Sequence, residues 1–210
     1  MGIEAGYKGL EDVNSSRGQF NAITFLVRQI LNRVSTATLV QITSVTNSGG
    51  ISPVGFVDVQ PLVNQLDGYG NAIPHGVLHH LPYMRLQGGA NAVIIDPQVG
   101  DIGIAIFADR DISSVSANKA QSNPGSFRQF DMADGMYIGG LLNGTPTQYV
   151  AFASGGITIT SPNQITLTAP AVQINGTVTV TGDLTAQGTS VHTHKHGGVQ
   201  AGGSQTGVPV

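Results

Sequence analysis

The feature that most constrains this chain is a series of short apolar pairs in its last third. One polar residue separates the two members of each pair, and successive pairs begin eight, seven and six residues apart. The pairs are Ile157/Ile159, Ile165/Leu167, Val172/Ile174 and Val178/Val180. Thr, Ser, Gln and Asn dominate beside them, and Gly or Pro occupies the gaps. This is a short-period β repeat, because alternation along a strand places both apolar members on one face.

Strands this short cannot enclose a core within one chain. Each offers only two apolar residues, and a single repeating ribbon would leave long unpaired edges. Three copies wound around one axis would turn every apolar face inward and pair every edge. Disorder is the alternative, but disordered segments usually rely on charge, and Asp183 is the only charged residue between Tyr149 and Val191. Residues 149–190 are therefore predicted to form an intertwined trimeric β-helix, a needle.

The composition narrows the classes of function. Only 10% of the residues are charged, against about 25% in ordinary soluble domains, and the net charge is −3. Nucleic-acid binding is not expected, because the few Lys and Arg residues form no basic cluster. Cysteine is absent, so disulfides and thiolate metal sites are excluded. The N-terminus has no signal-peptide pattern, and no apolar run is long enough to span a bilayer.

The first two thirds predict a mainly β region with one helix. Residues 1–35 are expected to form an arm and a helix over 16–34, with Phe20, Ile23, Val27, Leu31 and Val34 on one face and Ser15 or Ser16 as its cap. Residues 36–111 predict five short strands between Gly-rich turns, and hence a small barrel of the oligomer-binding (OB) type. The expected strands are 38–45, 54–63, 77–87, 92–95 and 102–108. Residues 112–148 are expected to be an irregular connector.

The terminal segment 191–210 carries three of the six histidines, at alternating positions 192, 194 and 196. In an extended strand their rings point to one face. If that face looks at a threefold axis, two histidines from each chain supply six imidazole nitrogens, an octahedral set that suits Fe(II) better than tetrahedral Zn. A solvated tail with chance histidines, or a fragment of a purification tag, is the alternative interpretation, although a tag is usually a contiguous run.

Other chemistry-bearing residues give weaker signals. His75, His79 and His80 have no acidic neighbour in sequence and are interpreted as surface or packing residues. Asp109-Arg110-Asp111 could be an acid/base pair, but a strand-end turn with a local ion pair is favoured. A metalloenzyme at the terminal histidines would need a carboxylate base, and no Asp or Glu follows Asp183. An OB-type binding module for nucleic acid or sugar on a trimeric stalk is the alternative function, but its aromatic residues are sparse.

Two stretches of the chain resemble a known family. The run from His194 to Val199, with Gly202-Gly203 and Thr206-Gly207-Val208-Pro209, closely resembles the tip of the central spike proteins of contractile-tailed phages. Residues 99–111 are similar to the OB domain of the membrane-puncturing members of that family. The resemblance covers most of the chain and implies an HxHGGV element that closes a trimeric β-helix around one iron ion.

The resemblance also implies residues and partners. His194 and His196 of each of three chains would be the iron ligands, since His196 directly precedes Gly-Gly-Val. Because this chain also has His192, the pair could instead be His192 and His194, with His196 capping the apex. The implied protein is not an enzyme: an OB collar attaches it to the hub of the baseplate at the virion tail tip. Its needle breaches the host outer membrane when the sheath contracts.

Overall fold

A computed structural model describes residues 14–47, 50–67, 69–195, 198 and 202. The chain divides into an N-terminal unit, Met1–Pro146, and a C-terminal unit, Thr147–Val210. The described residues are mainly β, with two α-helices and one 3-10 turn. None of the helices among them is long and apolar enough to cross a membrane.

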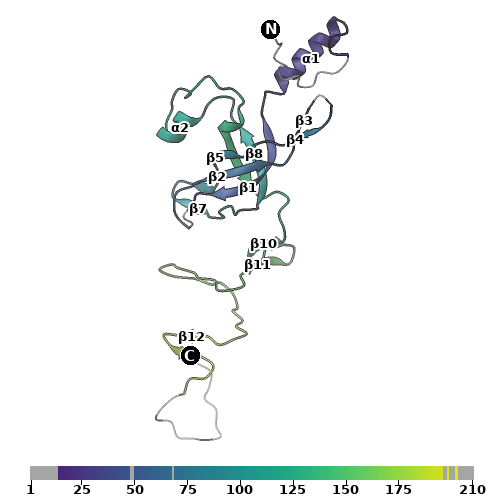
Figure 1. Cartoon of the computed structure of the whole chain (residues 1–210). Coiled ribbons are helices and arrows are strands. Elements are labelled where there is room, and N and C mark those ends of the chain that lie inside the picture. The colour runs from purple at the N-terminus through teal and green to yellow at the C-terminus, as the bar shows by residue number, and fades with distance from the viewer. Residues whose placement is uncertain (1–13, 48–49, 68, 196–197, 199–201, 203–210) are drawn as a thin grey trace. The chain divides into compact units, whose positions relative to one another are not determined.

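The N-terminal unit is built on one antiparallel sheet of five strands (Figure 1). Its order is β5-β2-β1-β8-β9, so that the long first strand pairs with both β2 and β8. The bounds are β1 Ala37–Val45, β2 Phe56–Pro61, β5 Leu78–Pro82, β8 Ile102–Phe107 and β9 Gly135–Gly139. The sheet curls until its two edges meet: Tyr83 forms a parallel bridge to Tyr137, and the Met84 N–H donates to the Tyr137 carbonyl at 2.9 Å.

Alternate residues of these strands fill one core. Val40 and Ile42 of β1 and Val57 and Val59 of β2 belong to this core, and each is at most 1% exposed. The remaining members are Leu81, Tyr83, Ala105, Phe107 and Tyr137. The strands expected at 38–45, 54–63 and 102–108 are confirmed. The stretch expected at 77–87 is divided between β5 and β6, Leu86–Gly88, which pairs with β7, Asn91–Val93.

The prediction of an irregular connector over 112–148 is wrong in part. This stretch holds α2, Ser113–Asn118, a 3-10 turn at Met132–Asp134, and the edge strand β9. Gly139 in β9 made the sequence resemble a loop, but it and Gly103 on β8 make room for Tyr137. A Cβ on Gly103 would lie 2.6 Å from the Tyr137 ring, and one on Gly139 would lie 3.0 Å from it. The glycines therefore mark close packing within the sheet rather than a turn.

Helix α1 spans Gln19–Leu31 and is shorter than the helix predicted over 16–34. Its N-cap is Gly18, with φ 93° and no side-chain hydrogen bond, so the prediction of a Ser15 or Ser16 cap is wrong. A left-handed backbone at this position suits glycine, which has no Cβ to clash. None of the residues in α1 is buried. A two-stranded excursion, β3 Gln65–Leu66 and β4 Ala72–Ile73, completes the N-terminal unit.

The C-terminal unit contains two separate hairpins in its described residues. The first joins β10, Tyr149–Ala153, to β11, Gly156–Thr160, and the second joins β12, Thr185–Ala186, to β13, Thr189–Ser190. Residues 161–184, all described, form no strand. Of the four apolar pairs in the repeat, only Ile157/Ile159 therefore lies in a strand of the single chain.

Candidate functional site

The β10–β11 hairpin presents an apolar face that the single chain leaves uncovered. Its register places Val150 opposite Ile159 and Phe152 opposite Ile157. Because side chains alternate along a strand, these four residues share one face of the hairpin. Their exposed fractions run from 55% for Val150 to 78% for Phe152. A two-stranded hairpin gains little stability alone, so this face needs a covering surface.

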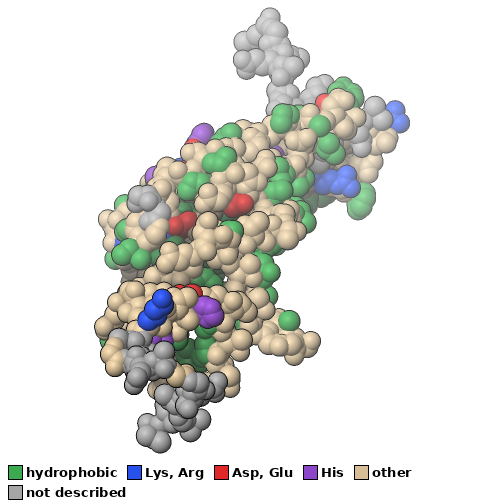
Figure 2. All heavy atoms as spheres, turned by 90° about the horizontal axis from the view of Figure 1, so that it is seen from below, with side chains coloured by type: hydrophobic (Ala, Val, Ile, Leu, Met, Phe, Trp, Pro, Cys, Tyr) green, Lys and Arg blue, Asp and Glu red, His purple; other side chains and the backbone are tan. Residues whose placement is uncertain are grey.

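The same exposure continues along the whole repeat. The eight residues of the four apolar pairs are between 48% and 72% exposed. Figure 2 shows hydrophobic side chains at the surface among backbone and uncharged polar atoms, with only scattered charged groups. So many large apolar side chains exposed in one segment indicate a surface that another chain covers. The residue between the two members of each pair is polar, so within each pair the apolar side chains lie on one side of the alternation.

The segment that carries the histidines begins with the tight β12–β13 hairpin. Gln187 and Gly188 form its two-residue loop, with φ values of 49° and 83°. Two consecutive left-handed residues are typical of a type I′ turn, whose twist matches that of the paired strands. The Val191 N–H donates to the Leu184 carbonyl at 2.7 Å and extends the pairing beyond β13. This pairing fixes the direction of the backbone at the point where the histidine segment begins.

Among the described residues, His192 and His194 lie on a turn in the single chain rather than on an extended strand. The His194 N–H donates to the Ser190 carbonyl at 3.2 Å, which closes one helical turn. The Thr193 N–H donates to Ser190 Oγ at 2.9 Å, and the His192 N–H donates to Asp183 Oδ1 at 3.2 Å. The Ser190 hydroxyl and the two backbone N–H groups of His192 and Leu184 lower the pKa of Asp183. In a single chain this turn satisfies backbone groups that a neighbouring strand would otherwise pair.

The ring of His194 has a defined orientation. Its Nδ1 lies 2.9 Å from the Val191 carbonyl oxygen, which can only accept a hydrogen bond. Nδ1 therefore carries the proton when the ring is neutral, and the lone pair is on Nε2, the arrangement usual for a histidine that binds a metal. His192 is exposed, and His196 lies outside the described residues. Within the described part of the chain, no group of three or more potential ligands forms a metal site.

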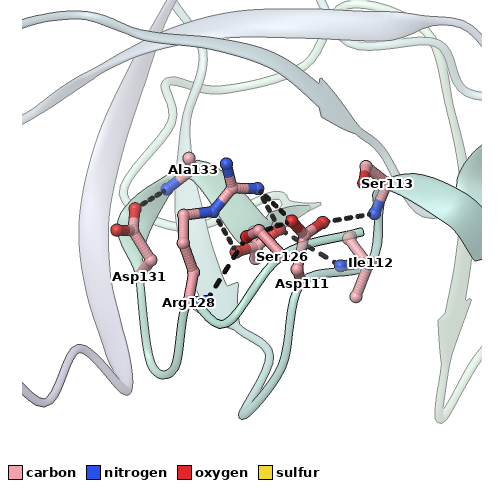
Figure 3. Close-up of polar contacts among 8 residues, drawn as sticks. Asp111, Ile112, Ser113, Ser126, Arg128, Asp131 and Ala133 are labelled. Carbon is pink, nitrogen blue, oxygen red and sulfur yellow. Dashed lines mark hydrogen bonds and ion pairs between the residues drawn. The ribbon is translucent and has the colours of Figure 1, made fainter. Parts of the chain in front are cut away.

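A second polar cluster lies in the N-terminal unit, around Asp111 and Asp134 (Figure 3). Arg128 contacts both carboxylates at 3.0 Å, and its Nε donates to Asp134 at 3.2 Å. Asp111 also accepts from the Ser113 N–H at 2.9 Å and from the Ser126 hydroxyl at 2.6 Å. These hydrogen bonds, with Arg128, hold the pKa of Asp111 well below its usual range.

The prediction of a local ion pair within Asp109-Arg110-Asp111 is therefore wrong, because Asp111 pairs with an arginine from outside this run. Asp111 pairs with Arg128, which follows it by 17 positions in the chain, and Arg110 is exposed. Because donors surround both oxygens of Asp111, this carboxylate is poorly suited to take a proton from a substrate. The cluster instead fastens residues 111–134 to the sheet just before β9.

The three histidines of the N-terminal unit lie at its surface or pack partly against it, with His75 half-buried and His79 and His80 exposed. His79 is 70% exposed on its side chain, and its Nδ1 lies 3.1 Å from Asp58 Oδ2. The His80 ring stacks on Phe56 with centroids 3.7 Å apart, and His75 accepts a hydrogen bond from Gln60 through its carbonyl. The acidic partner that the local sequence lacks is supplied by β2, where Asp58 lies 21 positions before His79.

Sequence reasoning missed a cavity of about 360 Å³ beside the point where the sheet edges meet. Its lining includes Tyr83, Arg85, Asp96 and Tyr137, together with several apolar side chains. Arg85 donates to Asp96 Oδ1 at 2.6 Å and to the Ser52 carbonyl at 2.7 Å, and its side chain is 5% exposed. The Tyr83 hydroxyl donates to the same carboxylate at 3.1 Å.

This arrangement offers little to a nucleic acid. The cation is neutralised by Asp96 and covered, whereas single-stranded nucleic acids bind to open basic grooves with stacking aromatic side chains. The signal that could have located the cavity is the Tyr-Met-Arg run directly after β5, followed by Asp96 after β7. Nothing in their spacing, however, predicts that the two segments meet.

Comparison with known families identifies the end of the chain. The family model described as GpV Apex motif matches residues 188–210, which begin at the turn of the β12–β13 hairpin and include His192, His194 and His196. No curated protein matches the chain. The terminal segment is thus similar to the apex of the GpV type, and this match supports a phage central spike protein.

Proposed function

We propose that three copies of this chain form the central spike of a contractile phage tail, which pierces the host outer membrane when the sheath contracts. The observation that carries the proposal is the apex match at residues 188–210, directly after a repeat whose apolar faces are all exposed in one chain. The match identifies the terminal segment as similar to a spike apex. The exposed apolar residues of the repeat are the physical reason to expect that several chains assemble.

The exposure of the repeat supports a trimeric needle. Burying the exposed half of each of its eight apolar side chains would contribute about 1 kcal/mol per residue. Residues 161–184 form no strand in the single chain, so this is the stretch whose backbone would pair with strands of other chains. Three chains around one axis supply both the apolar contacts and the missing hydrogen bonds.

The curled sheet supports an OB-type collar. Its strands run β5-β2-β1-β8-β9, and the bridge between Tyr83 and Tyr137 brings the two ends of this order together. A five-stranded, partly open barrel is the architecture of the OB fold. In the proposed spike this collar attaches the needle to the hub of the baseplate and has a structural role.

The donor set at the tip fits a shared metal ion. His194 and His196 of each chain would supply six imidazole nitrogens, and the contact of His194 Nδ1 with Val191 supports ligation through Nε2. His192 remains the alternative ligand, because its backbone lies on the same turn. An octahedral set of imidazoles favours Fe(II) over Zn. A saturated ion of this kind would serve only to fasten three chain ends, which otherwise fray.

The proposed mechanism is mechanical. The sheath supplies the work, and the needle has only to remain rigid while its narrow apex concentrates the force. Asp183 is the only charged residue between Tyr149 and Val191, so the flank of the needle carries few charged groups, which are the costliest to remove from water. The location implied for the chain is the virion tail tip.

Sedimentation and elemental analysis of the purified full chain test the assembly. We expect a mass of three chains and one iron per three chains. The double variant His194→Ala/His196→Ala is expected to lose the iron while the trimer persists, because the repeat and not the metal holds the chains together. The control His75→Ala/His79→Ala removes two histidines from the N-terminal unit and should retain the iron.

Each result has a contrary outcome. A well-folded monomer in solution would overturn the proposed spike. Stoichiometric iron in His194→Ala/His196→Ala would overturn both ligand pairs, because both contain His194. The single variants separate the pairs: His196→Ala should lose the iron and His192→Ala should retain it, and the reverse result would establish His192 and His194 as the ligands. Antibody labelling of purified tail particles tests the location: label at the distal tip is expected, and label confined to the sheath would contradict the proposal.

A further inference from the structure

Helix α1 carries a narrow apolar seam. Phe20, Ile23, Val27 and Ile30 follow one another at spacings of three, four and three residues, the a and d positions of a heptad repeat. Their exposed fractions are 81%, 53%, 47% and 65%. No residue of α1 is buried against the rest of the described chain. A helix with such a seam normally buries it against another helix.

The flanks of the seam extend its apolar surface. With Phe20 at a, Leu26 falls at g and Leu31 at e, and these two residues are 58% and 61% exposed. Arg28 falls at b, on the outer side of the seam. In a parallel bundle the g position of one helix lies beside the following e position of its neighbour. Leu26 of one copy would therefore contact Leu31 of the next, without bringing like charges together.

The residues at the seam select the number of helices. Ile at d, with a β-branched residue at the next a, favours three or more strands over two. Ile23 and Ile30 occupy d, and Val27 occupies the central a position. The apolar residues at e and g also favour three helices over two, because they widen the surface that each helix buries. The occupant that fits this face is thus α1 of two further copies of the same chain.

We infer that the α1 helices of three chains pack into a parallel three-stranded coiled coil, a second trimer contact besides the needle. The inference rests on the proposed function, because a helix of 13 residues is too short to associate stably alone. The trimeric needle would keep the three helices in one assembly, so that their association becomes intramolecular. It would also fix their direction, since chains wound around one axis in the same sense enter it in parallel.

Cysteine cross-linking of the full chain tests this arrangement, and the absence of native cysteine makes it clean. The variant Leu26→Cys/Leu31→Cys is treated with a short bis-maleimide and run on a denaturing gel. In a parallel trimer each helix is linked to both neighbours, so a covalent trimer is expected as the main product. A two-stranded coil would stop at the covalent dimer and overturn the inference.

A matched control uses the outer face of the same helix. Asn21→Cys/Asn32→Cys places thiols at b and f, which point away from the seam, and should give at least tenfold less covalent trimer. A second variant, Ile23→Glu/Ile30→Glu in the cross-linking background, should abolish the covalent trimer while sedimentation still reports three chains.

The outcomes separate this inference from the proposed function. If sedimentation gives three chains but Leu26→Cys/Leu31→Cys yields only monomer, the coiled coil is wrong and the spike stands. Coverage of the seam by residues 1–13 of the same chain would give that result. If sedimentation gives one chain, both proposals fail. Equal covalent trimer from the seam and the outer pair would also overturn the coiled coil, because the cross-links would then report mere proximity.

Discussion

In the N-terminal unit, alternate residues of five paired strands face one interior, and Val40, Val57 and Leu81 are 0% exposed. In the C-terminal unit the alternation is equally regular, yet Leu167 and Ile174 remain 72% and 64% exposed. The difference lies in pairing, because a single chain pairs the strands of the first unit and leaves residues 161–184 of the second without strands. A period-two pattern thus specifies an apolar face, whereas the number of chains that cover it depends on strand length and pairing.

The largest effect is expected from a charge placed on the exposed repeat, because it tests whether the apolar face of the repeat is buried between chains. Ile174→Asp should be harmless if the residue stays in water, and severely destabilising if three copies bury it together. Burial of an unpaired carboxylate costs several kcal/mol per ion, and three would meet near one axis. We expect loss of the trimer in sedimentation and a large fall in its melting temperature.

The matched control lies one residue away. Gln173→Asp introduces the same charge on the opposite face of the same stretch, so it should leave the trimer intact. Equal behaviour of the two variants would remove the distinction between an inner and an outer face, and with it the case for the needle.

A core truncation in the sheet gives the next largest effect. Leu81→Ala removes a side chain that is 0% exposed and packed in the main cluster, so it should lower the free energy of unfolding by about 2–5 kcal/mol. Leu86→Ala, at a position 67% exposed, should change it by less than about 0.5 kcal/mol. Urea titration followed by tyrosine fluorescence measures both. If the two variants unfold alike, the sheet has no single core.

The smallest expected effect is a pH dependence from the ionic cluster. The pKa of Asp111 is lowered in the folded chain by the Ser113 and Ser126 hydrogen bonds and by Arg128. Its stabilising contribution is therefore complete above the unfolded pKa of about 4 and declines as pH falls toward the lower folded pKa. The urea midpoint of Asp111→Asn should lie below that of the wild type at neutral pH, and the gap should narrow below about pH 4.

The exposed neighbour provides the control for this pH series. Asp109→Asn should follow the wild type at each pH, because this side chain lies outside the cluster. A gap between wild type and Asp111→Asn that is constant from pH 7 to pH 2 would show that the carboxylate charge contributes nothing.

Sequence patterns predicted those strands whose apolar residues alternate without interruption. β1 and β8 are of this kind, and their predicted bounds differ from the observed ones by one residue. β9 was missed, since its glycines resemble turn residues unless the Tyr137 ring that covers Gly103 and Gly139 is known. The cap of α1 was mispredicted for a related reason, because a left-handed glycine can begin a helix where the pattern favoured serine.

At the candidate site, residue types were more predictable than geometry. The alternating histidines identified the terminal segment, which is also where the apex match lies. Their expected common face stays a prediction, because His196 lies outside the described residues. In the single chain the Ser190 carbonyl and hydroxyl hold His194 and Thr193 in a turn. The pairing of Arg128 with Asp111 and of Arg85 with Asp96 was also beyond prediction, because each joins residues from separate segments.

By itself the sequence determined which residues must leave water and which atoms could bind a metal, because polarity, β-branching and alternation are local properties of the chain. Only the tertiary structure decided which strands pair, where the curled sheet closes at Tyr83 and Tyr137, and which carboxylates are neutralised. These outcomes depend on contacts between residues far apart in sequence, and their energies are set by distance and burial. No local pattern encodes either quantity.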